Sequence, residues 1–276
     1  MSLSRKNKKY LRKSKRNFYY YLRKNILTLG NFINKNKKHK YVFILSPPYS
    51  GSTLLNQIIS TSNNVSCNNN IGTREGQTLP EVSDILFKNK RWDKKKDIPW
   101  KIIKKTWRKY WDLSKPILLD KSTTNIMRAN KIREIFKPAS FICLVRNPYA
   151  QCEGIIRRSK KSAESAAKFT IKCLKYQKRN IENEKNLLFF TYEELCNKKE
   201  KIINDIHNFI PEINDIDINK KFKAHNFKSE KYMHITNLNQ EKINLLKARD
   251  LKIINKYFKQ EREILDYFNY TIIEEK

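Results

Sequence analysis

The sequence predicts an α/β fold in which a parallel β-sheet carries helices on both faces, as a three-layer sandwich. Two observations lead to this prediction. Short apolar runs rich in β-branched and aromatic residues recur along the chain, and segments with helical spacing of apolar residues follow them. Strands that alternate with helices form parallel sheets, and strands that are apolar on both sides are typical of sheets covered on both faces.

The strands and helices are expected in alternation from residue 41 onward. Strands are predicted at 41–45, 117–119, 140–145 and 187–190. Helices are predicted at 52–60, 79–87, 100–111, 124–136, from Asn147-Pro148 onward, at 193–209 and at 240–268. A polar, Asn-rich loop is expected at 61–75 and an irregular segment at 211–238.

Length and composition indicate one globular domain with a basic extension. A chain of 276 residues with 39% hydrophobic residues can bury a sizeable core, so we expect a single domain over residues 41–276. The net charge of +32 has two interpretations. It indicates an anionic partner, or it reflects a composition biased toward Lys, Asn and Ile.

The extension, residues 1–40, carries 14 Lys or Arg and no Asp or Glu. Residues 17–33 have helical spacing, and the apolar side chains close to one face are Phe18, Leu22, Ile26, Leu29 and Ile33. One interpretation is a surface helix that contacts an anionic lipid or polymer. The other is a solvated basic extension that packs loosely on the domain.

Cysteine usage indicates a reducing compartment. The five cysteines are odd in number and include no C-x-x-C pair, so neither a disulfide framework nor a zinc site is predicted. No run approaches 18 apolar residues, and the N-terminus lacks the apolar core of a signal peptide. We expect a cytoplasmic protein, with peripheral membrane contact through residues 1–40 as the open alternative.

The turn after the first strand is a candidate phosphate site. The run Ser46-Pro-Pro-Tyr-Ser-Gly-Ser-Thr53 joins a strand to a helix whose first N–H groups have no helical partner, and Ser50, Ser52 and Thr53 add hydroxyl donors. The run is not a Walker A loop, because the position of the Walker Lys holds Ser52. A P-loop kinase or NTPase therefore remains only as an alternative.

A second anion-binding position follows the third predicted strand. Arg146 ends that strand, where ligands of open α/β sheets bind. Arg158 lies twelve residues later, about three helical turns, so we expect it on roughly the same face as Arg146. Two guanidinium groups on one face suit a phosphate.

These two segments, in this order, resemble the PAPS-dependent sulfotransferases (PAPS is 3′-phosphoadenosine 5′-phosphosulfate), and among them the tyrosylprotein and carbohydrate branch. The resemblance covers residues 41–270. It implies a sulfotransferase-like fold with a P-loop-like sheet. It also implies that Pro48, Tyr49, Ser50, Gly51, Ser52 and Thr53 hold the 5′-phosphosulfate of the donor, and that Arg146 holds its 3′-phosphate. The spacing between Arg146 and Arg158 adds Arg158 to the 3′-phosphate site.

Three further segments carry the resemblance. Leu119-Asp-Lys-Ser122 is similar to the strand end whose Lys lies near the transferred group, which places Lys121 there. Phe190-Thr-Tyr-Glu-Glu-Leu195 is similar to the strand end whose Tyr lies near the nucleotide, here Tyr192. Gly72-Thr-Arg-Glu-Gly-Gln77 is similar to the segment that supplies a catalytic Glu, here Glu75, and Glu81 is the nearest rival for that role.

Two positions depart from the family pattern. The phosphate loop usually has Lys or Arg where this chain has Tyr49, and a Ser for the 3′-phosphate usually stands where this chain has Gly154. Lys121 or Arg74 could replace the first missing group, and Arg158 the second.

The resemblance implies transfer of a sulfuryl group from PAPS to a hydroxyl of a peptide tyrosine or a carbohydrate. No metal is expected, because Lys, Arg and N–H groups can meet the charge of the leaving bisphosphate. The four histidines, His39, His207, His225 and His234, do not stand at strand ends and are expected to be structural or exposed. For His234 a second interpretation stays open, because it falls in the irregular segment that could close over the nucleotide. The charge alone also suggests a non-catalytic protein that binds nucleic acid or another polyanion, but no specific nucleic-acid motif is present.

Overall fold

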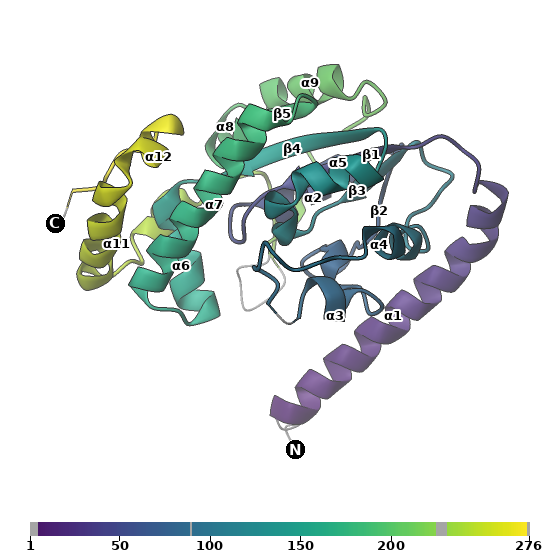
Figure 1. The fold of residues 1–276 in the computed structure, drawn as a ribbon, viewed down its shortest axis with the longest axis horizontal. Helices are drawn as coiled ribbons and strands as arrows, with labels where there is room; N and C mark the ends of the chain where they lie inside the picture. Colours follow the sequence, from purple (N-terminus) through teal and green to yellow (C-terminus); the bar gives the residue numbers. More distant parts are fainter. Residues whose placement is uncertain (1–4, 89, 225–230, 275–276) are drawn as a thin grey trace.

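The central sheet is built from five parallel strands. The protein is described by a computed structural model that covers residues 5–88, 90–224 and 231–274. The strand order is β2–β3–β1–β4–β5 (Figure 1). Their bounds are β1 Lys40–Leu45, β2 Val65–Cys67, β3 Ile117–Asp120, β4 Ala139–Val145 and β5 Leu187–Thr191. The predicted fold class is confirmed.

The apolar strands have two covered faces. Successive side chains of a strand point to opposite faces, so β1 sends Val42 and Ile44 into one core and Tyr41, Phe43 and Leu45 into another. All five side chains are buried. Because both faces of this strand are buried, none of its side chains faces solvent. The sequence of the strand is therefore a continuous apolar run and does not alternate between apolar and polar residues.

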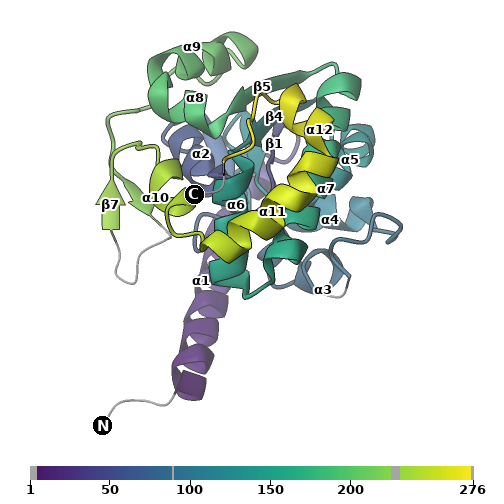
Figure 2. The ribbon, with the colours of Figure 1, turned by 90° about the vertical axis from the view of Figure 1, so that its left-hand side faces the viewer.

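Helices form the outer layers. One face of the sheet is covered by α2 Ser52–Ile59, α8 Tyr192–Asn197 and α9 Lys199–Phe209. The opposite face is covered by α3 Ser83–Leu86, α4 Trp100–Trp107, α5 Ala129–Ile135 and α7 Ala163–Asn183. A third apolar cluster joins α7 to α6 Pro148–Ser159, α11 Ala248–Gln260 and α12 Arg262–Tyr267, and Figure 2 shows α11 lying across α6 and α7.

Several predicted elements are wrong in extent or were missed. The expected loop 61–75 contains β2, and the expected irregular segment contains β6 Phe222–Ala224 paired with β7 Lys231–Met233, while residues 225–230 lie outside the described part. All three are three-residue strands, too short for a recognisable pattern. The sequence also did not separate α7 from α6, which ends where Lys160 adopts a left-handed conformation.

The predicted helices are shorter than expected because local turns interrupt them. The pattern 240–268 divides into α10 Asn239–Ile243, α11 and α12. The segment 193–209 breaks at Lys198, and 100–111 stops at Trp107. The helix expected at 79–87 begins only at Ser83, after turn residues, and the 3₁₀ turn η2 Thr123–Met127 replaces the start of the helix expected at 124–136. A second 3₁₀ turn, η1 Gly76–Thr78, lies just beyond the expected loop 61–75. Apolar spacing survives such breaks, so the periodicity did not reveal them.

The helix predicted at 17–33 is part of a longer helix, α1 Arg5–Ile33, which lies along the edge of the domain beside α3 and α4 (Figure 1). Its predicted apolar face does not touch the domain. Phe18, Ile26 and Leu29 are exposed, whereas Tyr20 on the other side is buried in the core. Within residues 5–88, 90–224 and 231–274, each helix is too short or too polar to span a lipid bilayer.

Candidate active site

A cavity of about 340 Å³ lies where the carboxyl ends of the five strands meet. One lining residue follows each strand in turn: Tyr49, Glu75, Lys121, Arg146 and Tyr192. In a parallel sheet all carboxyl ends share one edge, so residues far apart in the sequence converge there. Of the predicted site residues only Ser50 does not line the cavity.

The loop between β1 and α2 forms a tight turn. Tyr49 and Gly51 have φ angles of 68° and 88°, in the left-handed region that favours glycine. A Cβ atom on Gly51 would also lie 2.5 Å from the ring of Tyr192, so this position requires glycine. The turn leads into the first N–H groups of α2, which attract anions. The hydroxyl of Ser50 is buried and has no hydrogen-bond partner in the described structure.

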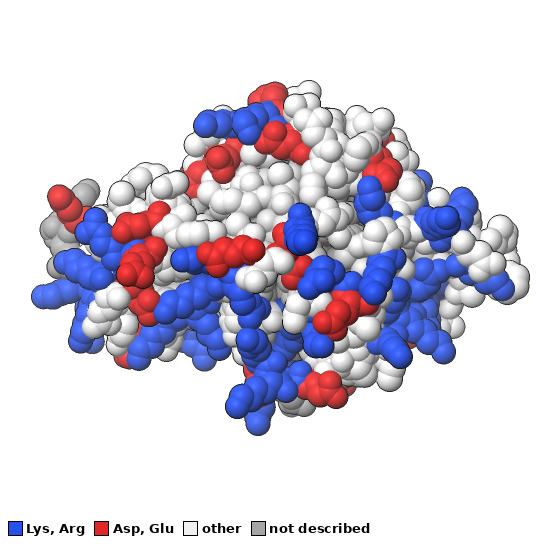
Figure 3. All heavy atoms as spheres, turned by 45° about the horizontal axis from the view of Figure 1, so that its top comes forward, with Lys and Arg blue, Asp and Glu red and all other residues white. Residues whose placement is uncertain are grey.

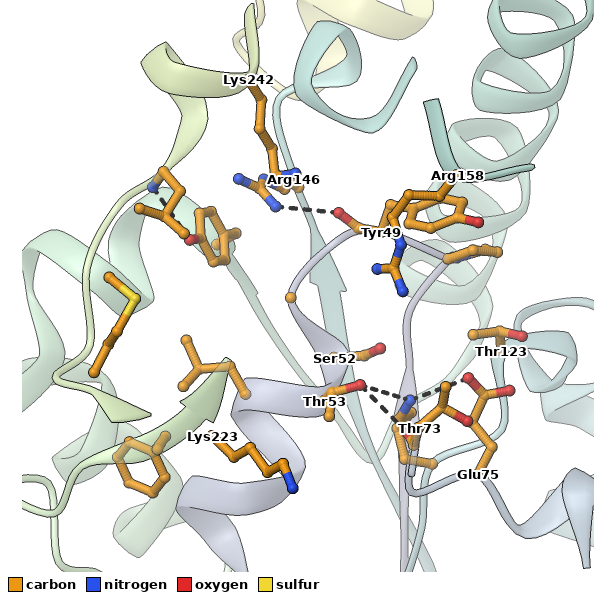
Figure 4. Close-up of a pocket in the computed structure, with 18 of the residues that line it drawn as sticks. Tyr49, Ser52, Thr53, Thr73, Glu75, Thr123, Arg146, Arg158, Lys223 and Lys242 are labelled. Atoms are coloured by element: carbon orange, nitrogen blue, oxygen red, sulfur yellow. Dashed lines mark hydrogen bonds and ion pairs between the residues drawn. The ribbon is translucent and has the colours of Figure 1, made fainter. Parts of the chain in front are cut away.

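Arg146 is 4% exposed and held from three sides. Its Nε donates to Asn239 Oδ1 at 2.7 Å, and its Cζ lies 4.0 Å from the ring centre of Tyr192. Its Nη1 donates to the carbonyl of Tyr49 at 3.2 Å (Figure 4). Burial lowers the pKa of Arg146 from its ordinary value. Its Nη2 is buried without a partner among the described residues. The unpartnered donors Nη2 and Ser50 Oγ fit an anionic ligand.

Arg146 and Arg158 converge, but not along one helix face. Helix α6 begins only at Pro148, capped by the side chain of Asn147, so Arg146 belongs to the strand end. Arg158 comes from the far end of α6 and places its Cζ 5.4 Å from the ring centre of Tyr49. In Figure 4 the guanidinium group of Arg146 lies at the carbonyl of Tyr49 and that of Arg158 lies at the ring of Tyr49. Both residues line the cavity, but Arg146 precedes the helix, so the two residues do not share one helix face.

The two departures from the family pattern contact each other. The Tyr49 ring lies against Gly154, where an added Cβ atom would stand 2.8 Å from Tyr49 Cβ and Cγ. The hydroxyl of Tyr49 forms a 2.6 Å hydrogen bond with Ser159 Oγ. A side chain at position 154 and this placement of the ring exclude each other, so the two departures belong to one packing arrangement.

Glu75 and Lys121 form a buried ion pair at the cavity wall. Lys121 Nζ lies 3.3 Å from Glu75 Oε1 and 3.2 Å from Thr53 Oγ1 of the phosphate loop (Figure 4). The side chain of Lys121 is 1% exposed and that of Glu75 is 11% exposed. Burial lowers the pKa of Lys121. The alternative residues lie elsewhere. Glu81 pairs with Lys24 of α1, and Arg74 donates to Asn70 and Cys67 and does not line the cavity.

Gln77 and Asp120, which the sequence did not predict as site residues, fix the segment that carries Glu75. Gln77 donates to Glu75 Oε2 and is itself fixed by the hydroxyls of Thr123 and Thr124. Asp120 is fully buried and accepts the N–H of Gly76 at 3.2 Å. Burial raises the pKa of Asp120 to about 6. The only sequence signal was the place of these residues beside Glu75 and Lys121, and the contacts between them form only in the fold.

A further cation reaches the cavity from a distant part of the chain. Lys242 on α10 lines the cavity, is 6% exposed and lies 3.3 Å from Glu153 Oε2 on α6. Burial lowers the pKa of Lys242. It was hidden inside the predicted helix 240–268, in which nothing distinguished it from the other lysines.

Of the histidines, His234 is exposed and lines the cavity, which the sequence reading left open. His39 meets the carbonyl of Leu113 at 2.9 Å, His207 lies on α9, and His225 is outside the described residues. Within the described residues, no three His, Cys, Asp or Glu are grouped so that they could hold a metal ion.

The sequence profile of the Sulfotransferase family matches residues 42–212. The chain belongs to the sulfotransferase family. The matched region contains the phosphate loop, Glu75, Lys121, Arg146 and Tyr192 of the cavity. Lys242 and His234 lie beyond it.

One solved structure with a TM-score above 0.5 agrees on the fold, and two others have TM-scores below 0.5. A sulfotransferase from Alicyclobacillus acidocaldarius is similar with a TM-score of 0.51 and 9% identity, over 84% of this chain and 96% of that one. The sulfotransferase domain from the curacin biosynthetic pathway has a TM-score of 0.49 and 16% identity, over 86% and 100%. Mouse sulfotransferase SULT7A1 complexed with PAP has 0.47 and 14%, over 84% and 86%. A comparison with curated protein sequences gave no match.

Proposed function

We propose that this sulfotransferase transfers a sulfuryl group from PAPS to a hydroxyl group of its acceptor. The observation that carries the proposal is the contact between Glu75, Lys121 and the phosphate loop. A carboxylate and an ammonium group lie 3.3 Å apart, and the ammonium also reaches Thr53 at 3.2 Å. A proton acceptor and a cation therefore stand together at the predicted position of the donor's sulfuryl group.

Binding of the donor is assigned to three groups of residues. The 5′-phosphosulfate would contact Pro48 to Thr53, where Ser50 Oγ and the N–H groups of α2 can donate hydrogen bonds. The 3′-phosphate would be met by Arg146 Nη2 and Arg158, with the buried Lys242 as an added cation. Tyr192, which lines the cavity, would contact the nucleotide. When bound, the donor supplies the sulfuryl group and a bisphosphate leaving group.

Glu75 would remove the proton of the acceptor hydroxyl, because its carboxylate lines the cavity and is held in one orientation by Gln77. Lys121 would stabilise negative charge on the leaving oxygen. Its ammonium group is removed from water, so its interaction with an anion is less screened than at the surface. No step requires a metal in this scheme.

The acceptor is proposed to be a peptide tyrosine or a carbohydrate. The remaining cavity wall includes the aromatic side chains of Phe87 and Phe222 and the cations Arg91 and Lys223. Aromatic faces accept a phenol ring or a sugar ring, and cations favour an acceptor that carries acidic groups. In Figure 3, Lys and Arg predominate among the charged side chains of the face shown, which supports an anionic acceptor.

We further propose that residues 41–276 form one catalytic domain with residues 1–40 as an extension, and that the protein works in the cytoplasm. The first strand of the sheet begins at Lys40, which supports the boundary. All five cysteines are free, and four of them are buried, which suits a reducing compartment.

Calorimetric titration with adenosine 3′,5′-bisphosphate, with ATP and ADP as controls, tests the donor site. Micromolar binding that depends on the 3′-phosphate is expected. Transfer of labelled sulfate from PAPS to tyrosine peptides and to glycans then tests the acceptor class. If the protein binds ATP with Mg²⁺ and does not bind adenosine 3′,5′-bisphosphate, the proposal is wrong, and the function of a kinase or NTPase is favoured.

A further inference from the structure

Helix α1 is fixed to the domain by its polar side. Tyr20 is 2% exposed and its hydroxyl donates to Asn69. Arg23 donates to the carbonyls of Cys67 and Tyr110, at 2.9 and 3.1 Å. Asn31 donates to the carbonyl of Trp111 at 2.8 Å and accepts the N–H of Leu113. These contacts fix the rotation of the helix about its axis.

The opposite side of α1 is apolar and open to solvent. The apolar stripe, as we call it, is formed by side chains between 45% and 77% exposed, namely Phe18, Tyr21, Leu22, Ile26, Leu29, Phe32 and Ile33. Their spacing of three and four residues places them on one helix face about 22 Å long. Surface helices normally turn such a face toward the core. The polar contacts of Arg23 and Asn31 prevent that rotation, so the stripe needs another partner.

The charge around the stripe selects the class of partner. Lys15 and Arg16 precede it, and Lys35, Lys37 and Lys38 follow it, within a 40-residue segment that has 14 Lys or Arg and no acidic residue. A second copy of the chain would bring two such basic segments together, which costs free energy. A nucleic acid offers phosphates but no medium for aliphatic side chains. An anionic bilayer offers both negative headgroups and an apolar layer beneath them.

We propose that α1 binds the surface of anionic lipid bilayers, with the apolar stripe inserted at the boundary between headgroups and acyl chains. The flanking lysines and arginines contact the headgroups. The helix lies in the plane of the surface and does not cross the bilayer. This membrane contact is independent of the transfer reaction, because the stripe and the cavity share no residue.

The test is co-sedimentation of the full chain with vesicles. Vesicles of phosphatidylcholine with about one quarter phosphatidylserine are compared with vesicles of phosphatidylcholine alone. The wild-type protein should bind the anionic vesicles, and added salt should weaken the binding. The double variant Ile26→Gln/Leu29→Gln should bind at least about tenfold more weakly, because two apolar side chains no longer enter the bilayer. Gln is a good helix former, so α1 should persist, which circular dichroism checks.

The matched control is Ile102→Gln/Leu245→Gln, which removes two exposed apolar side chains of other elements. It should bind vesicles like the wild type. Equal binding by the stripe variant would mean that only charge adsorbs the protein, and the proposal would fail. It would also fail if lipid-free protein self-associates in a way that the stripe variant abolishes, because the stripe would then bind a second copy. Nucleotide titration of the same variants keeps this result separate from the proposed transfer activity.

Discussion

Replacing Arg146 with Gln tests the assignment of the 3′-phosphate. Arg146 already uses two of its nitrogens within the protein, Nε toward Asn239 and Nη1 toward Tyr49. Its Nη2 is buried and has no partner in the described structure. The variant therefore removes an N–H donor and a positive charge that the fold itself leaves available to a ligand.

The size of the effect follows from that donor. A hydrogen bond between a charged group and its partner contributes about 1.5–3 kcal/mol. Since about 1.4 kcal/mol corresponds to a factor of ten, Arg146→Gln should weaken binding of adenosine 3′,5′-bisphosphate by roughly ten- to a hundredfold. Binding of adenosine 5′-phosphate, which lacks the 3′-phosphate, should change much less.

Calorimetry with both nucleotides, on the wild type and the variant, measures this coupling directly. The wild type should prefer the bisphosphate, and the variant should lose most of that preference. Arg133→Gln is the control, because Arg133 pairs with Glu184 and does not line the cavity. If the variant weakens both nucleotides equally, Arg146 does not contact the 3′-phosphate and the reasoning is refuted.

Three further predictions concern the base, the packing under the loop and a buried carboxyl. Glu75→Gln should leave bisphosphate affinity within about twofold and lower turnover by at least about a hundredfold, measured with labelled donor; retained turnover would place the base elsewhere. Gly154→Ser should destabilise the protein by about 1–3 kcal/mol in thermal unfolding, and by less in a Tyr49→Gly background, which removes both the ring and the Cβ atom of Tyr49. An equal cost in both backgrounds would contradict the contact. Burial raises the pKa of Asp120 from 3.8 to about 6, so its contribution to stability is fully present below about pH 4 and is lost as the pH rises through 6. Relative to the wild type, the free energy of unfolding of Asp120→Asn should therefore rise by up to about 3 kcal/mol between pH 4 and pH 7, as measured by urea unfolding. If the difference in free energy between the two proteins does not depend on pH, the raised pKa of Asp120 is not the cause.

The sequence predicted the parts of the fold that strong local patterns encode. The apolar runs at β1 and β4 identified buried strands to within one residue, because a strand covered on both faces must be apolar throughout. The three-residue strands β2, β6 and β7 carried no comparable pattern. Helix ends were misplaced for the same reason, since turns at Lys160 and Lys198 interrupt the chain without interrupting its apolar spacing.

The sequence also predicted most of the residues that line the cavity. Arg146 was predicted from its position directly after a strand, because the carboxyl ends of parallel strands share one edge of the sheet. Glu75, Lys121 and Tyr192 were predicted from the family resemblance, and Glu75 follows the strand β2, which the sequence did not predict. Residues that reach the cavity from helices could not be found in this way. Lys242 is such a case, since its approach depends on how α10 packs against α6.

The sequence by itself thus determined the family, the sheet and the residues at its carboxyl edge, because each depends on patterns within a few neighbouring positions. The tertiary structure decided what each side chain meets. It showed that Tyr49 and Gly154 are two halves of one contact, and that Gln77 and Asp120 position the segment of Glu75. The tertiary structure also decided that the apolar face of α1 points to solvent. Hydrogen bonds from Arg23 to the domain fix the rotation of the helix, and they form only between segments that the fold brings together.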